Sequence, residues 1–198
     1  MSIKQKVSEV NQVFDQLGAE IAAFQSTSQL SCVAGCGKCC QKPDINASVL
    51  EFLPLAYALY QEGRADEVYD EMTQLGADDF CHFFRPVNKE ANQGYCGSYQ
   101  QRGLICRLFG FSARKDKNGL PTMITCKVIK EGQAEKYQET DRAIKSKELA
   151  IPNSAEFYMQ LYSIDFALAQ EQMPINEAIK RALEIVLTYY SYGGEEAV

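Results

Sequence analysis

The sequence contains the segment Cys32-Val33-Ala34-Gly35-Cys36-Gly37-Lys38-Cys39-Cys40, in which four cysteines fall within nine residues. A regular helix or strand would distribute these side chains over different faces, so the pattern does not arise from core packing. The two glycines let the backbone turn tightly, so that the sulfur atoms converge and backbone N–H groups point toward them. Such donors stabilise thiolates, and the thiolate is the form of cysteine that binds a metal. The segment therefore predicts a metal site without indicating which metal.

Four further cysteines follow at wider spacing, namely Cys81, Cys96, Cys106 and Cys126. Each one alone would be interpreted as a buried structural residue, because free cysteine packs as a small apolar side chain. Together with the first segment they indicate that distant parts of the chain close over one or two metal sites. All eight cysteines are therefore candidate ligands, including Cys32, Cys36, Cys39 and Cys40.

We expect the adjacent residues Cys39 and Cys40 to have different roles. Successive side chains diverge, so the two residues rarely ligate one mononuclear ion together. One of them would then serve a second metal or remain a redox-active thiol.

Composition and charge narrow the class of protein. The chain has 46% hydrophobic and 23% charged residues, as in ordinary globular proteins. A net charge of -6 and the absence of a Lys/Arg-rich run argue against binding to nucleic acid. The first residues do not form a secretory signal, and no apolar run is long enough to span a bilayer. We therefore expect a cytoplasmic protein that binds no membrane, where eight cysteines favour metal ligation over disulfides.

The length of 198 residues fits a single domain over residues 1–198. Apolar residues recur at alternating four- and three-residue steps from Ile3 to Phe24, which predicts one helix over residues 1–28. The cysteine-rich metal-binding region covers residues 32–128. Residues 150–193 are expected to form C-terminal helices that are interrupted at Pro174.

Some regular structure is also expected inside the cysteine-rich region. Ser48 and Glu51 fit a capping box before an apolar segment that ends at Tyr60, with Pro54 causing a kink or a later helix start. A short helix is predicted over 65–75, and a β-hairpin with strands 107–113 and 122–128 around the turn 116–119. The expected fold is mainly α with a small β-hairpin, and its irregular cysteine-rich segment is flanked by N- and C-terminal helices.

The order of the motifs carries a family resemblance. The sequence reads Cys-x3-Cys-Gly-x-Cys-Cys, then Cys81-His82-Phe83-Phe84, then Cys96-Gly97-Ser98-Tyr99-Gln100-Gln101-Arg102, then Cys106-Arg107-Leu108-Phe109. This order resembles the YkgJ family of zinc- or iron-chelating domains, which has a CxxCxxCC signature. The resemblance covers residues 32–128 and implies all the cysteines except Cys126 as motif residues. The family pattern places Arg-Pro before the Cys-Arg pair, whereas here Gly103 follows Arg102.

The ligand set bears on the choice of metal. An all-cysteine set suits an iron–sulfur cluster, which accepts widely spaced thiolates. Structural zinc sites usually use two close ligand pairs, of which only one is evident here. The sequence thus favours, by a small margin, an iron–sulfur cluster with a redox or transfer role. The alternative is structural Zn²⁺ in a non-catalytic interaction or metal-handling module, and two zinc sites would use eight cysteines equally well.

Two other residues are candidates for cofactor binding. His82, the only histidine, lies beside Cys81, although a lone histidine is more often structural. Arg107, beside Cys106, could donate to cluster sulfurs, bind an anionic substrate or form a salt bridge. No Ser–His–Asp set, phosphate loop or paired-carboxylate motif identifies catalytic residues. Whether the protein is an enzyme, and whether it acts on a protein or a small molecule, stays open at this point.

Overall fold

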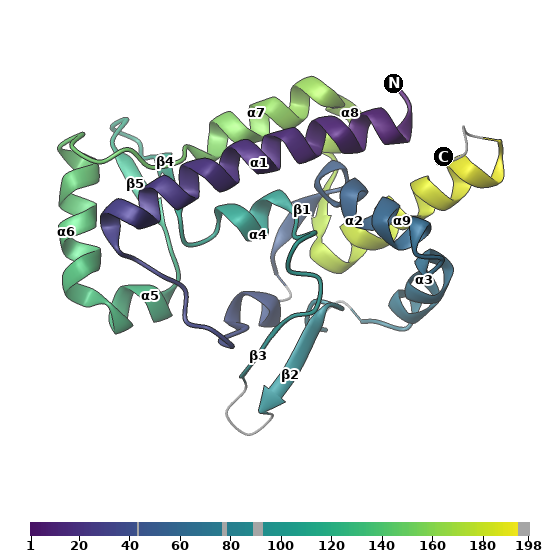
Figure 1. The fold of residues 1–198 in the computed structure, drawn as a ribbon, viewed down its shortest axis with the longest axis horizontal. Coiled ribbons are helices and arrows are strands. Elements are labelled where there is room, and N and C mark those ends of the chain that lie inside the picture. The colour runs from purple at the N-terminus through teal and green to yellow at the C-terminus, as the bar shows by residue number, and fades with distance from the viewer. Residues whose placement is uncertain (43, 77–78, 89–92, 194–198) are drawn as a thin grey trace. The chain divides into compact units, whose positions relative to one another are not determined.

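The computed structural model describes residues 1–42, 44–76, 79–88 and 93–193 (Figure 1). Within these ranges the chain forms nine α-helices, two short 3-10 helices and three two-stranded antiparallel sheets. The prediction of a mainly α fold with a small β-hairpin is therefore confirmed, and the other two sheets were not predicted. None of the helices in the described residues combines the length and the apolar composition that a membrane span requires.

The chain divides into two compact units. Unit 1 comprises Met1–Gln12, Gly35–Gly103 and Gln160–Val198, and unit 2 comprises Val13–Ala34 and Leu104–Met159. Two compact units can belong to one cooperative domain, so the single domain over residues 1–198 stays a prediction.

The N-terminal helix is confirmed as α1 (Ile3–Ser28). Its buried side chains repeat at three- and four-residue steps, which places them on one face of the helix. They are Ile3, Val7, Val10, Val13, Phe14, Leu17 and Phe24. The helix ends where Gln29 adopts a left-handed conformation, with φ 56°, and its N–H donates to the carbonyl of Gln25 at 2.9 Å.

Unit 1 is built around α9 (Ile175–Ser191), which packs against α2 (Leu53–Gln61) and α3 (Ala65–Thr73). The packed face of α9 consists of buried small and aliphatic side chains, namely Ala178, Ile179, Ala182, Leu183 and Val186. Before α9 come α8 (Phe166–Gln170) and β6 (Gln172–Pro174), which pairs with β1 (Asn46–Ser48). The predicted interruption at Pro174 is confirmed, because this residue is the N-cap of α9.

The segment before α2 shows how a buried acid is accommodated. Glu51 lies fully buried in the 3-10 turn η2 (Leu50–Phe52). Its Oε1 accepts hydrogen bonds from the Ser48 backbone N–H at 2.6 Å and from the Ser48 hydroxyl at 2.9 Å. The half of the predicted capping box in which Glu51 accepts from the Ser48 N–H is therefore present, but the N-cap of η2 is Val49, which makes no side-chain cap. Pro54 lies in the first turn of α2, so the later helix start is the alternative that the structure adopts.

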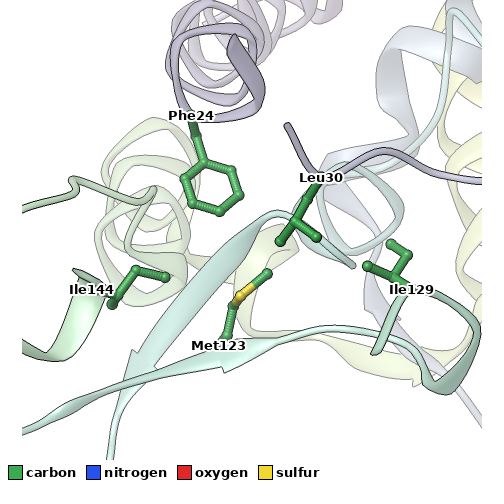
Figure 2. Close-up of a cluster of buried hydrophobic side chains, with 5 residues drawn as sticks. All are labelled: Phe24, Leu30, Met123, Ile129 and Ile144. Atoms are coloured by element: carbon green, nitrogen blue, oxygen red, sulfur yellow. The ribbon is translucent and has the colours of Figure 1, made fainter. Parts of the chain in front are cut away.

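Unit 2 has its own hydrophobic cluster, which Figure 2 shows in close-up. Its side chains come from the end of α1, from the segment after it, from β5 (Pro121–Ile124), from α5 (Lys127–Gly132) and from α6 (Ala134–Lys145). They are Phe24, Leu30, Met123, Ile129 and Ile144. This cluster fixes the segment that enters the cysteine-rich region, because Leu30 lies only two residues before Cys32.

The predicted hairpin is correct in its turn, but its strands are shorter than predicted and lie closer to the turn. Asp116 Oδ1 accepts from the backbone N–H groups of Asn118 and Leu120 at 2.8 and 2.9 Å, which closes the turn. The strands are β4 (Ser112–Lys115) and β5. Residues 104–108 form the helix α4 (Leu104–Leu108) instead of the strand that the sequence predicted from 107 onward. Residues 127–128 begin α5 instead of extending the second strand. The helix α7 (Ser154–Ile164) completes the C-terminal helices.

Truncation of Leu30 tests the cluster of unit 2. Leu30 is fully buried, so Leu30→Ala should lower the free energy of unfolding by about 3 kcal/mol through lost burial and the cavity left behind. Urea unfolding followed by circular dichroism measures the change. Leu120, which is 46% exposed in the hairpin turn, provides the control, and Leu120→Ala should stay within about 0.5 kcal/mol of the wild type. Equal effects of the two substitutions would contradict this packing.

Candidate metal centre

The first cysteine segment forms a tight turn. Gly35 and Gly37 have φ values of 69° and 59°, in the left-handed region that glycine occupies without strain. Gly37 is the N-cap of the 3-10 helix η1 (Lys38–Gln41), and its carbonyl accepts from the Cys40 backbone N–H at 3.0 Å. The turn that the sequence predicted from its two glycines is therefore present.

This turn packs closely against a hairpin formed by β2 (Phe84–Asn88) and β3 (Gln93–Cys96), which Figure 1 labels. The Gly94 N–H donates to the Gly35 carbonyl at 3.1 Å. A Cβ atom on Gly37 would lie 2.5 Å from the Phe84 ring and 2.7 Å from the Gly94 carbonyl oxygen. A Cβ atom on Gly94 would lie within 2.5 and 2.6 Å of two Phe84 ring carbons. Glycine is thus required at position 37 by the close approach of the Gly94 backbone, and at position 94 by the close approach of β2 within the hairpin.

Backbone hydrogen bonds also place Cys81 and Cys96. The Cys81 N–H donates to the Cys40 carbonyl at 2.9 Å, and the Phe84 N–H donates to the Cys81 carbonyl at 2.8 Å. Cys96 lies directly opposite Phe84 in the β2–β3 pair. Three segments that are far apart in the sequence therefore bring four cysteines together in unit 1.

The thiols of three of these residues interact directly. Cys40 shares side-chain hydrogen bonds with Cys39 and with Cys96. Hydrogen bonding to Cys40 is the main cause that lowers the pKa of Cys39 to about 6 and that of Cys96 to about 7. The positive charge of Arg102 lowers both pKa values further. The pKa of Cys40 itself is raised, because its proton is the one shared with its two neighbours.

Cys81 differs from the others because it is buried. Desolvation disfavours its thiolate and raises its pKa to about 11. The group as a whole thus combines two thiols of lowered pKa with two of raised pKa. Cys40 and Cys81 hold their protons near neutral pH, and these protons would leave if all four sulfurs bind a metal, since ligating cysteines must be deprotonated.

The donor chemistry of the group fits a thiophilic metal. Four cysteines form a sulfur-only set, which suits zinc or an iron–sulfur cluster and does not suit magnesium or calcium. Among the described residues, however, no three His, Cys, Asp or Glu side chains already have a metal-site geometry. Adjustment of side-chain torsions or of the loop would therefore accompany metal uptake.

The other predicted ligands are placed differently. Cys36 belongs to unit 1 and is partly exposed, between the two glycines of the turn. Cys32, Cys106 and Cys126 belong to unit 2, and Cys32 is exposed. Cys126 is the N-cap of α5, and its Sγ accepts from the Ile129 backbone N–H at 3.3 Å. A ligand role for these four cysteines stays a prediction.

His82 and Arg107, the two predicted cofactor-binding residues, both have protein partners. His82 Nε2 lies 3.2 Å from Glu71 Oε2, and its ring meets the Phe83 ring edge-on with centroids 5.0 Å apart. Burial lowers the pKa of His82, and the Glu71 charge opposes this effect. The Arg107 guanidinium carbon lies 4.5 Å from the centroid of the Phe14 ring. Cofactor binding by either residue stays a prediction.

Sequence reasoning assigned no role to Arg102, although its charge acts on two of the four thiols. It also did not predict the open cavity of about 480 Å³ beside the buried thiol. This cavity is lined by Leu75, Asp79, Phe80, Cys81, His82 and Phe84. The sequence signal for Arg102 was its place in the motif after Cys96, at the arginine of the family's Arg-Pro pattern.

Comparison with known families agrees with this chemistry. The model of the CxxCxxCC family, described as a "putative zinc- or iron-chelating domain", matches residues 31–143. The chain belongs to this family. All eight cysteines lie inside the matched range, so the CxxCxxCC domain includes residues of both units. No curated protein and no solved structure gives a significant match. The family description supports metal binding and specifies no reaction.

The lowered pKa of Cys39 predicts selective alkylation. In the metal-free, reduced protein, Cys39 is exposed and mostly thiolate at pH 7, so iodoacetamide should modify it much faster than the buried Cys81. The rate at Cys39 should fall as the pH drops through about 6, because protonation removes the nucleophile. Peptide mapping by mass spectrometry measures both sites in one sample. Equal rates at the two cysteines would contradict the assigned electrostatics.

Substitution of Cys126 separates capping from ligation. Cys126→Ala should lower the free energy of unfolding by about 1 kcal/mol, because the first turn of α5 loses its acceptor. Cys126→Ser should largely retain stability, since a hydroxyl oxygen also caps a helix. Urea unfolding of the metal-free protein compares the two variants. If serine and alanine destabilise the protein equally, Cys126 is not acting as a cap.

Proposed function

We propose that this protein holds an iron–sulfur cluster at Cys39, Cys40, Cys81 and Cys96, and that the cluster serves a redox or transfer role. The observation that supports the proposal is the convergence of these four cysteines from three segments of unit 1. Cys39 and Cys96 both lie close enough to Cys40 for its thiol to shift their pKa values. Such a grouping of thiols has no evident value for packing, because three of the four residues are not buried.

The choice of iron–sulfur over zinc follows from the adjacent pair. Cys39 and Cys40 both face the group, and consecutive cysteines seldom bind one tetrahedral ion together. A cluster offers several iron atoms, so neighbouring thiolates can bind different metals. When bound, the cluster would supply one-electron chemistry, with the exposed Cys39 near the protein surface.

Zinc is the second candidate, and one observation favours it. The number of interacting cysteines equals the four ligands of a closed structural zinc site, and the family description includes zinc. In that case the metal would stabilise unit 1, and the domain would serve as an interaction or metal-handling module.

Metal analysis of protein purified without oxygen distinguishes these alternatives. We expect iron together with acid-labile sulfide and a broad visible absorption. Cys40→Ser and Cys96→Ser should each lose most of this absorption, because each removes a ligand from the group. Cys126→Ser is the matched control and should retain it.

Two results would contradict the proposal. Stoichiometric zinc in a colourless protein would rule out the iron–sulfur assignment and support the structural alternative. Full metal content in both Cys40→Ser and Cys96→Ser, with loss in Cys126→Ser, would place the centre elsewhere in the chain.

A further inference from the structure

We propose that a small cavity in unit 1 binds a short-chain carboxylate, and that Arg85 holds the charged end of this ligand. The cavity has a volume of about 150 Å³ and is bordered by α2, by β2 and by the segment after β3. All of its lining residues belong to unit 1, and none of them is a cysteine. The site is therefore separate from the metal ligands and does not depend on the proposed function.

Arg85 is held in one orientation by the backbone around it. Its Nη1 donates to the carbonyls of His82 and Phe84 at 2.7 and 3.2 Å. Gly97 lies against the same side chain, because a Cβ atom there would be 3.1 Å from Arg85 Cγ and 3.3 Å from its Nε. Within the described part of the chain, Nε and Nη2 of Arg85 make no hydrogen bond. This edge of the guanidinium can donate two parallel hydrogen bonds to a carboxylate.

The charges around the cavity favour a ligand with a single negative charge. Arg64 and Arg85 line the cavity together with one carboxylate, that of Glu62. Arg64 Nη1 lies 3.1 Å from Glu62 Oε2, so these two charges largely offset each other. Arg85 then supplies the positive charge that has no carboxylate partner among the lining residues.

The other walls of the cavity provide one polar and one apolar part. The Ser98 hydroxyl donates to Gln101 Oε1 at 3.3 Å, which leaves the Gln101 Nε2 as a further donor. The apolar part includes the buried side chains of Leu55, Leu59 and Phe83. A cavity of about 150 Å³ has room for several water molecules, and thus for a carboxylate with a short aliphatic chain such as butyrate.

Binding of butyrate to the full chain tests the proposal. Saturation-transfer NMR at constant ionic strength should show saturable binding in the millimolar range, because so small a ligand makes few contacts. Arg85→Gln removes the charge and the paired donors and should weaken binding roughly tenfold or more. Arg181→Gln removes the same charge from an arginine paired with Glu184 at 2.9 Å, so it is the matched control and should bind as the wild type does.

Two further variants keep the test independent of any damage to the fold in Arg85→Gln. Arg85→Lys keeps the charge without the planar fork and should retain part of the affinity. Glu62→Gln removes the only carboxylate that lines the cavity and should strengthen butyrate binding severalfold. Circular dichroism reports whether each variant keeps the helical content of the wild type.

Two changes of ligand test the chemical class. Butylammonium has the same chain with the opposite charge and should not bind. Acetate should bind more weakly than butyrate, because it lacks the carbons that would contact the apolar wall.

Several results would overturn the proposal. They are the absence of saturable butyrate binding to the wild type, an unchanged affinity in Arg85→Gln, and equal losses in Arg85→Gln and Arg181→Gln. Weaker butyrate binding in Glu62→Gln would contradict the assigned charges. Inorganic phosphate that binds more tightly than butyrate, and is lost in Arg85→Gln, would show an anion site that does not select a carboxylate with an apolar chain.

Discussion

The close backbone approach between the cysteine turn and the β2–β3 hairpin is the constraint on which the candidate centre depends. Hydrogen bonds join Gly94 to Gly35 and Cys81 to Cys40, and a Cβ atom on Gly37 would overlap the Gly94 carbonyl. The thiols lie close together because the backbone segments that carry them lie close together. The frame is made of main-chain groups, so it does not depend on which sulfur atoms bind a metal.

Local sequence patterns predicted the elements that depend only on residues close together in the chain. The long apolar stripe gave α1 at nearly its observed bounds, and Asp116 and Gly119 gave the turn of the β4–β5 hairpin. The β2–β3 hairpin was not predicted, because Phe84–Asn88 contains Arg85 and Pro86 and shows no alternation of apolar and polar residues. The β1–β6 pair has three residues in each strand, too few for a periodic signal.

The sequence predicted the chemistry of the candidate site, but not which of the eight cysteines lie together in it. The clustered thiols indicate a metal on spacing alone, whereas the grouping of Cys40 with Cys81 and Cys96 follows from tertiary hydrogen bonds that no spacing contains. Cys126 was expected in a strand and is instead a helix cap, a position at which Ser, Thr, Asp and Asn are the usual signals. The charge of Arg102 acts across a turn, which a sequence pattern does not report.

The hydrogen-bonded main chain around the cysteines also affects how much of the free energy of metal binding is offset by ordering of the chain. In small zinc-dependent folds the ligands are disordered without the ion, and most of the binding energy is consumed in ordering the chain. Here the Cys40 carbonyl and the Gly35 carbonyl already accept hydrogen bonds that involve no metal ligand atom. The backbone of such a site is preorganised, so the chain loses less conformational entropy when a metal binds, and the adjustment that remains is that of the cysteine side chains and their loop. Exchange of the metal would then proceed on a folded chain, as a ligand equilibrium separate from the folding transition.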